Sequence, residues 1–156
     1  MGSKYQIVAM SYRQIFYQIV FSTKGRLPTI PEAHCRDLYR YITAIVHERN
    51  CFMYQINGIE DHIHIFCDLH PTIALANFVK EIKVATSQWM KGSIRFPEFT
   101  GWQDRYGAFT YNIRERDKII RYVANQKEHH RDEGSLDEFK RLLIENDIPF
   151  DEKYLE

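Results

Sequence analysis

The chain has 156 residues, of which 44% are hydrophobic and 14% aromatic, and its 21 basic residues equal its 21 acidic ones. This length and apolar content predict one soluble domain with a hydrophobic core and exclude a separate regulatory domain. No apolar stretch approaches the roughly 20 residues of a membrane span, and the N-terminus lacks the hydrophobic segment of a signal peptide, so we expect a cytoplasmic protein without a membrane partner.

The first predicted elements are a strand and a helix. Residues 1–9 show no periodic pattern, and Met10 is a candidate natural start with an added leader before it. Apolar residues alternate with others over residues 13–22, which predicts a strand. Pro31 then opens a predicted helix that ends near Arg49, with apolar residues at helical spacing.

Two strands and a long helix follow. The strands are expected over residues 52–59 and 62–68, joined by a tight turn at residues 60–61. Thr72 is the expected cap of a helix that continues to Lys91 and carries an apolar stripe on one side.

The last third of the chain contains a short predicted strand at residues 108–111 and helices over residues 119–130 and 135–146. Ser135 and Glu138 have the spacing of a capping box at the start of the final helix. The order β-α-β-β-α-β predicts an α+β fold, a ferredoxin-like split βαβ antiparallel sheet with additional C-terminal helices.

The sequence His62-Ile63-His64 is the most informative motif. The two-residue period of a strand directs both imidazoles to one face, whereas Ile63, Ile65 and Cys67 point to the other, into a helix-covered core. Two convergent imidazoles form half of a metal site, and the alternative is a pair of surface or hydrogen-bonded histidines. A zinc site that includes Cys67 is disfavoured because that residue has the wrong parity.

A second cluster lies on the helix predicted over residues 119–130. Helical spacing places Tyr122, Gln126 and His129 on one stripe, at i, i+4 and i+7, beside an apolar stripe. Such a helix can pack through one side while it presents a phenol, an amide and an imidazole. The alternative is an ordinary tyrosine at the rim of a core, because the chain has ten tyrosines.

Together, the two motifs resemble those of the single-tyrosine HUH transposases of the insertion-sequence 200/605 class. The resemblance covers nearly the whole chain, as one HUH transposase domain over residues 1–156, and includes segments 21–26 and 102–109. Relaxases place the tyrosine before the histidine motif, and replication initiators usually have lysine where Gln126 stands. The transposase subclass is therefore favoured.

The resemblance implies that Tyr122 attacks single-stranded DNA, forms a 5′-phosphotyrosine and releases a 3′-hydroxyl. A divalent metal, Mg or Mn, on His62, His64 and Gln126 would polarise the scissile phosphate. The resemblance also implies recognition of DNA hairpins at element ends. It further implies a homodimer in which the tyrosine helix of one subunit can complete the histidine site of the other.

Charge is unevenly distributed, although its sum is zero. Residues 132–156 form an acidic C-terminal extension with nine acidic and three basic residues, which leaves residues 1–131 with a net charge of +6. This basic body permits a phosphate-binding face. Candidate backbone contacts are Lys24, Arg26, Lys80 and Lys83, and candidates for stacking on unpaired bases are Trp102, Tyr106 and Phe109. For each of these the alternative is an ordinary surface cation or core aromatic.

The cysteines at positions 35, 51 and 67 lack CxxC spacing, which favours reduced buried thiols over disulfides.

Two questions stay open. His129 and His130 could tune the site or only stabilise a helix C-terminus. The alternative functions are a non-catalytic module that binds single-stranded nucleic acid, which has no need for the four motif residues together, and a metal-dependent phosphoesterase, which forms no covalent adduct.

Overall fold

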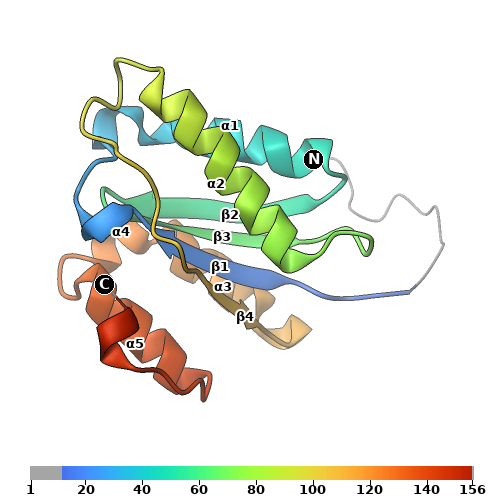
Figure 1. Ribbon diagram of the computed structural model, residues 1–156. Helices are drawn as coiled ribbons and strands as arrows, with labels where there is room; N and C mark the ends of the chain where they lie inside the picture. Colours follow the sequence, from blue (N-terminus) through green and yellow to red (C-terminus); the bar gives the residue numbers. More distant parts are fainter. Residues whose placement is uncertain (1–11, 156) are drawn as a thin grey trace.

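A four-stranded antiparallel sheet is the centre of the fold in the computed structural model, which describes residues 12–155 (Figure 1). The predictions for residues 1–9 and Met10 lie outside the described residues. The strands are β1 (Tyr17–Ser22), β2 (Phe52–Ile59), β3 (His62–Asp68) and β4 (Gly107–Thr110), in the spatial order β2-β3-β1-β4. The predicted α+β class and the ferredoxin-like strand order are confirmed.

Helices cover both faces of this sheet (Figure 1). One face carries α1 (Cys35–Glu48) and α2 (Leu75–Lys91), and the other carries α3 (Arg116–Ala124), α4 (Gln126–His129) and α5 (Ser135–Glu145). Short 3-10 turns lie at Lys24–Arg26, Glu32–His34, Ile113–Glu115 and Glu152–Tyr154. Among the described residues, no helix is long and apolar enough to cross a bilayer.

The two faces of β3 have the parity expected from the sequence. Ile63, Ile65 and Cys67 are fully buried in the larger core, which contains residues of α1 and α2. Phe66 lies on the opposite face and packs with Val123 of α3. The three cysteines are free and buried, as predicted.

The hairpin that presents the histidines depends on Gly58. A Cβ atom at this position of β2 would lie 2.1 Å from the carbonyl oxygen of His62 and 2.9 Å from the Cα of Ile63. Only glycine permits so close an approach between the two strand backbones. The hairpin thus holds the His62 backbone directly against β2.

Several predicted boundaries are corrected. Strand β1 begins at Tyr17 rather than at residue 13, because its ladders with β3 and β4 both start at that residue. The first helix begins with a 3-10 turn, and its α-helical part runs from Cys35 to Glu48. Thr72 is not the cap of α2: the cap position is Ala74, and the Thr72 hydroxyl instead pairs with the His70 ring.

Two corrections concern the C-terminal helices. The helix expected over residues 119–130 starts earlier, at Arg116, and is interrupted at Asn125, so Tyr122 lies in the last turn of α3 and Gln126 opens α4. The capping box at Ser135 and Glu138 is wrong, because Gly134 is the cap residue of α5. The side chains of Ser135 and Glu138 instead contact residues that are distant in sequence. Ser135 donates a hydrogen bond of 3.0 Å to the Asp61 carboxylate.

Candidate active site

The two histidines of β3 lie on the face covered by α3, α4 and α5, where they are 1% exposed or less. Their rings are 5.1 Å apart between centroids. The Nδ1 atom of His62 lies 2.7 Å from the Asp61 carboxylate, and Nδ1 of His64 lies 3.0 Å from Nε2 of Gln18. These outer contacts orient both rings so that their Nε2 atoms face the same point.

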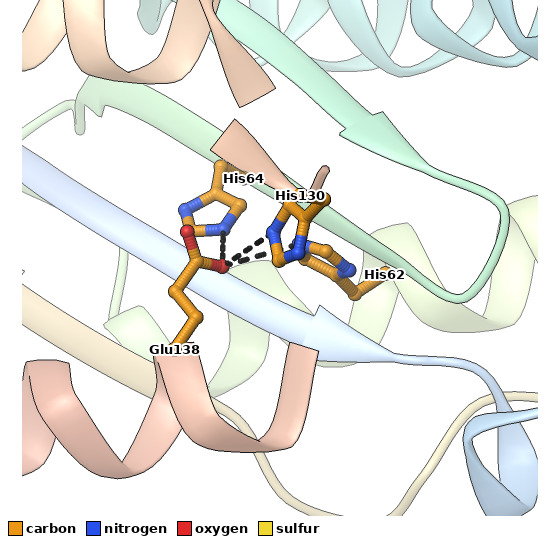
Figure 2. A group of neighbouring side chains, drawn as sticks. All are labelled: His62, His64, His130 and Glu138. Carbon is orange, nitrogen blue, oxygen red and sulfur yellow. Dashed lines mark hydrogen bonds and ion pairs between the residues drawn. The ribbon is translucent and has the colours of Figure 1, made fainter. Parts of the chain in front are cut away.

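A glutamate from α5 occupies that point. Glu138 is 1% exposed, and its Oε1 atom lies 2.9 Å from Nε2 of His64, 3.0 Å from Nε2 of His130 and 3.3 Å from Nε2 of His62. Figure 2 shows the three rings directed toward this one carboxylate. The cluster therefore joins β3, the end of α4 and α5, three parts of the chain that are distant in sequence.

Gln126 and His130 complete the cluster from α4 and the residue after it. The Oε1 atom of Gln126 lies 3.2 Å from Nε2 of His62 and 3.0 Å from Nε2 of His130. His130 donates from Nδ1 to the carbonyl oxygen of Glu133 at 2.6 Å, which leaves its Nε2 directed at the cluster. Thus the structure brings together the three predicted metal ligands and adds His130 and Glu138.

Burial and hydrogen bonding shift the pKa values of these groups in opposite directions. Burial alone would lower the pKa of His62, but its hydrogen bonds to Asp61 and Glu138 raise the value to about 9. Burial dominates at His64 and lowers its pKa to about 4. At Glu138 burial would raise the pKa, yet hydrogen bonds with three histidines hold it well below its usual range. The cluster is a charged carboxylate neutralised by imidazolium.

The donor set fits a divalent metal ion. The ligand atoms of His62, His64, His130 and Glu138 all lie within 4.8 Å of one another. Adjacent ligands of an octahedral ion with bonds of about 2.1 Å lie roughly 3 Å apart, close to the distances of 2.9 to 3.3 Å between Oε1 of Glu138 and the imidazole nitrogens. Imidazole nitrogens together with carboxylate and amide oxygens suit Mn²⁺ and also the softer Zn²⁺ and Ni²⁺.

Tyr122 lies at the edge of the same cluster. Its hydroxyl donates to Oε2 of Glu138, and its ring packs edge-on against His64 with 5.9 Å between centroids. Gln126 donates to the same Oε2 atom at 3.0 Å. Burial and the charge of Glu138 raise the pKa of Tyr122 above its ordinary value, whereas Arg141 acts in the opposite direction. The phenol is therefore protonated at neutral pH.

Other predicted residues lie farther from this centre. Arg26 donates to the Ser22 hydroxyl at 2.9 Å and to the carbonyl of Leu155 at 3.2 Å. Lys80 is exposed on α2, and the ammonium of Lys83 donates to the carbonyls of Gln103 and Arg105, so α2 places both on the sheet face opposite the histidines. Lys24 is exposed in the first loop.

Of the aromatic residues proposed to stack on bases, two are core residues. Trp102 is 9% exposed and donates from Nε1 to the Thr86 hydroxyl at 2.9 Å. Phe109 is 2% exposed and packs with Leu142 of α5. Both are therefore core aromatics, which was the alternative to base stacking. Of the three, only Tyr106 is half-buried.

Sequence reasoning missed Glu138, Asp61, Gln18 and Arg141 as members of the site and left His130 open. The sequence does indicate a role for Asp61 in the site, because a carboxylate beside a potential ligand histidine commonly orients its ring. It does not indicate one for Glu138, since the spacing of this residue from Ser135 also fits a capping box. Its role depends on where α5 packs, which no local pattern specifies.

Comparisons with known proteins identify the family of the chain and similar folds. The family described as IS200-like transposases matches residues 11–126. A candidate transposase from Deinococcus radiodurans R1 has a similar solved structure, with a TM-score of 0.58 and 21% identity, covering 74% of this chain and 94% of that one. A REP-associated tyrosine transposase bound to a REP hairpin gives a TM-score of 0.59 with 15% identity, covering 77% of this chain and 73% of that one. No curated protein matches.

Proposed function

Since this chain belongs to the family of IS200-like transposases, we propose that it cleaves and rejoins single-stranded DNA through a covalent bond between Tyr122 and a 5′-phosphate. Family membership makes the chain a tyrosine transposase, an enzyme of DNA recombination. One observation carries the assignment of the site: the Tyr122 hydroxyl and the clustered imidazoles all meet at the carboxylate of Glu138.

The chemistry assigned to Tyr122 requires removal of its proton. The hydroxyl already donates to Glu138, so that carboxylate is the nearest acceptor. As the phenol oxygen bonds to phosphorus, the bond from phosphorus to the 3′-oxygen breaks, and that oxygen leaves as a hydroxyl after it takes up a proton. The reverse attack by a 3′-hydroxyl restores the phosphodiester and needs neither ATP nor water.

We propose His62, His64 and Gln126 as ligands of a divalent metal, Mg or Mn, and add His130 and Glu138 to this set. A bound metal would supply positive charge at the scissile phosphate. The burial of all five side chains supports a specific site, because a buried carboxylate and imidazoles need paired charge. Asp61 and Gln18 would keep two of the rings in a metal-binding orientation.

The proposed substrate is single-stranded DNA with hairpin ends, a partner class that the REP-associated relative supports through its bound hairpin. Lys24, Arg26, Lys80 and Lys83 stay proposed backbone contacts, and their different positions imply more than one contact region. We propose a cytoplasmic homodimer in which each active site forms within one chain, since Tyr122 and His64 of the same chain are in contact.

The test is covalent capture. Purified protein with Mn²⁺ or Mg²⁺ is incubated with a pool of labelled single-stranded hairpin oligonucleotides and separated in SDS. We expect a labelled protein band with the wild type and none with Tyr122→Phe. Cleavage without an adduct would instead establish a phosphoesterase, and hairpin binding without cleavage would establish a binding module.

A further inference from the structure

A second residue of α5 reaches the proposed nucleophile. Arg141 donates from Nη2 to the Tyr122 hydroxyl oxygen at 2.8 Å, and its guanidinium lies over the Tyr122 ring at 5.7 Å from the centroid. Helical spacing places Glu138 and Arg141 on the same side of α5, one turn apart. Both lie beyond residues 11–126, the segment that matches the family, so the C-terminal extension supplies contacts that the match does not include.

Acidic side chains hold this guanidinium in place. Nε of Arg141 lies 3.1 Å from Oε2 of Glu133, and Nη1 lies 3.0 Å from Oε1 of Glu145. His129 is the remaining neighbour, at 3.1 Å from Nη2. A guanidinium fixed from two sides need not reorganise when charge develops beside it, which is the arrangement that makes electrostatic stabilisation effective.

The arginine also lies on the accessible side of the centre. The side chains of His62, His64 and Glu138 are 1% exposed or less, whereas that of Arg141 is 32% exposed. A DNA phosphate that approaches the half-buried Tyr122 hydroxyl therefore reaches the guanidinium before it reaches the rings of His62 and His64. Arginine suits this position because its planar donors match phosphate oxygens.

We propose that Arg141 is a catalytic residue of the DNA cleavage step, in which its guanidinium stabilises the negative charge shared by the attacking phenol oxygen and the transferred phosphoryl group. In this step the Tyr122 oxygen bonds to phosphorus and loses its proton, and the bond to the 3′-oxygen breaks as that oxygen takes up a proton. Arg141 keeps its own protons throughout. The inference rests on the proposed function, because it requires Tyr122 to be the nucleophile.

The test compares Arg141→Ala, Arg141→Lys and a matched control, Lys140→Gln, on the same helix. Lys140 pairs with Glu152 and does not contact the site. The readout is the single-turnover rate of adduct formation at saturating hairpin DNA. We expect Arg141→Ala to slow adduct formation by about 10²- to 10³-fold, the usual effect of removing one donor to developing charge. We expect an intermediate rate for Arg141→Lys and no change for Lys140→Gln.

Chemical rescue separates catalysis from structure. Because Arg141 is partly exposed, millimolar guanidinium should enter the space left in Arg141→Ala. It should raise the rate of adduct formation by this variant at least about tenfold, whereas urea at the same concentration should not. Unchanged adduct formation by Arg141→Ala, or a loss in a correctly folded variant that guanidinium does not restore, would overturn the role of Arg141. An adduct that persists in Tyr122→Phe would overturn the proposed function itself.

Discussion

At the scale of single residues, Glu138 is the group at which the other side chains of the proposed active site meet. Its carboxylate accepts a hydrogen bond from Tyr122 and lies within 3.3 Å of three imidazoles, although it is almost completely buried. A carboxylate so placed is stable only while positive charge surrounds it. The protonated His62 ring supplies positive charge in the absence of metal, and a divalent ion would replace its proton.

Substituting Glu138 tests its place among the ligands. We expect Glu138→Gln to weaken Mn²⁺ binding by at least about 10-fold, because a charged ligand is replaced by a neutral amide. Titration of Mn²⁺ followed by electron paramagnetic resonance measures the affinity. The control is Asp137→Asn, an exposed neighbour on α5. Tighter binding in Glu138→Gln would show that the carboxylate competes with the metal instead of holding it.

The pKa shifts of the two strand histidines predict a pH of maximum folding stability for the metal-free protein. The pKa of His64 falls from 6.5 to about 4, so the folded state binds fewer protons than the unfolded state between these values, and stability rises with pH there. The pKa of His62 rises from 6.5 to about 9, so its stabilising contribution is complete below pH 6.5 and is lost toward pH 9. Thermal unfolding in EDTA should therefore give the highest Tm near pH 6.5.

Metal should shift this optimum upward. A metal ion on Nε2 of His62 competes with the proton that the raised pKa retains, so Mn²⁺ affinity should increase from pH 7 to about pH 9. Isothermal titration in buffers of different ionisation enthalpy should detect proton release on binding. An affinity independent of pH in this range would exclude His62 as a ligand.

At the scale of elements, strands were more predictable than helix packing. The alternation in β3 correctly separated His62 and His64 from the core residues Ile63 and Ile65, because strand parity depends only on local geometry. The position of α5 depends on its burial of apolar residues against β1 and β4, a long-range contact without a local signal. Glu138 was therefore predicted to be a helix cap when it lies in the site.

The β2–β3 hairpin offers a direct test of how the histidines are held. We expect Gly58→Ala to destabilise the protein by more than about 2 kcal/mol, since its Cβ would overlap the His62 carbonyl and force the strands apart. For a chain of this size the Tm should fall by at least about 4 °C. Gly92→Ala, where a Cβ would meet only ordinary contacts of 3.5 Å or more, is the control. A Tm for Gly58→Ala equal to the wild-type value would contradict the close approach.

At the scale of the whole molecule, one chain supplies a complete set of proposed active-site groups. Tyr122 and both strand histidines contact Glu138 of the same chain. A dimer that exchanged tyrosine helices would instead combine residues of two chains. The acidic C-terminal extension, which balances the basic body in net charge, brings α5 and two of the site residues with it.

Mixing inactive variants distinguishes these arrangements. If each site forms within one chain, an equimolar mixture of Tyr122→Phe and His64→Ala should form no more adduct than either variant alone. Co-expression of the two chains allows mixed dimers to form. Recovery of about a quarter or more of wild-type adduct would show that the tyrosine of one chain serves the histidines of its partner.

The identity of the nucleophile is tested most directly by mapping the covalent adduct. The wild-type protein is trapped with Mn²⁺ and a cleavable hairpin oligonucleotide, digested with nuclease and protease, and analysed by mass spectrometry. We predict that a 5′-linked nucleotide is found on the peptide that contains Tyr122, with a free 3′-hydroxyl on the released strand. Attachment to any other residue, or cleaved DNA with wholly unmodified protein, would contradict the proposed function.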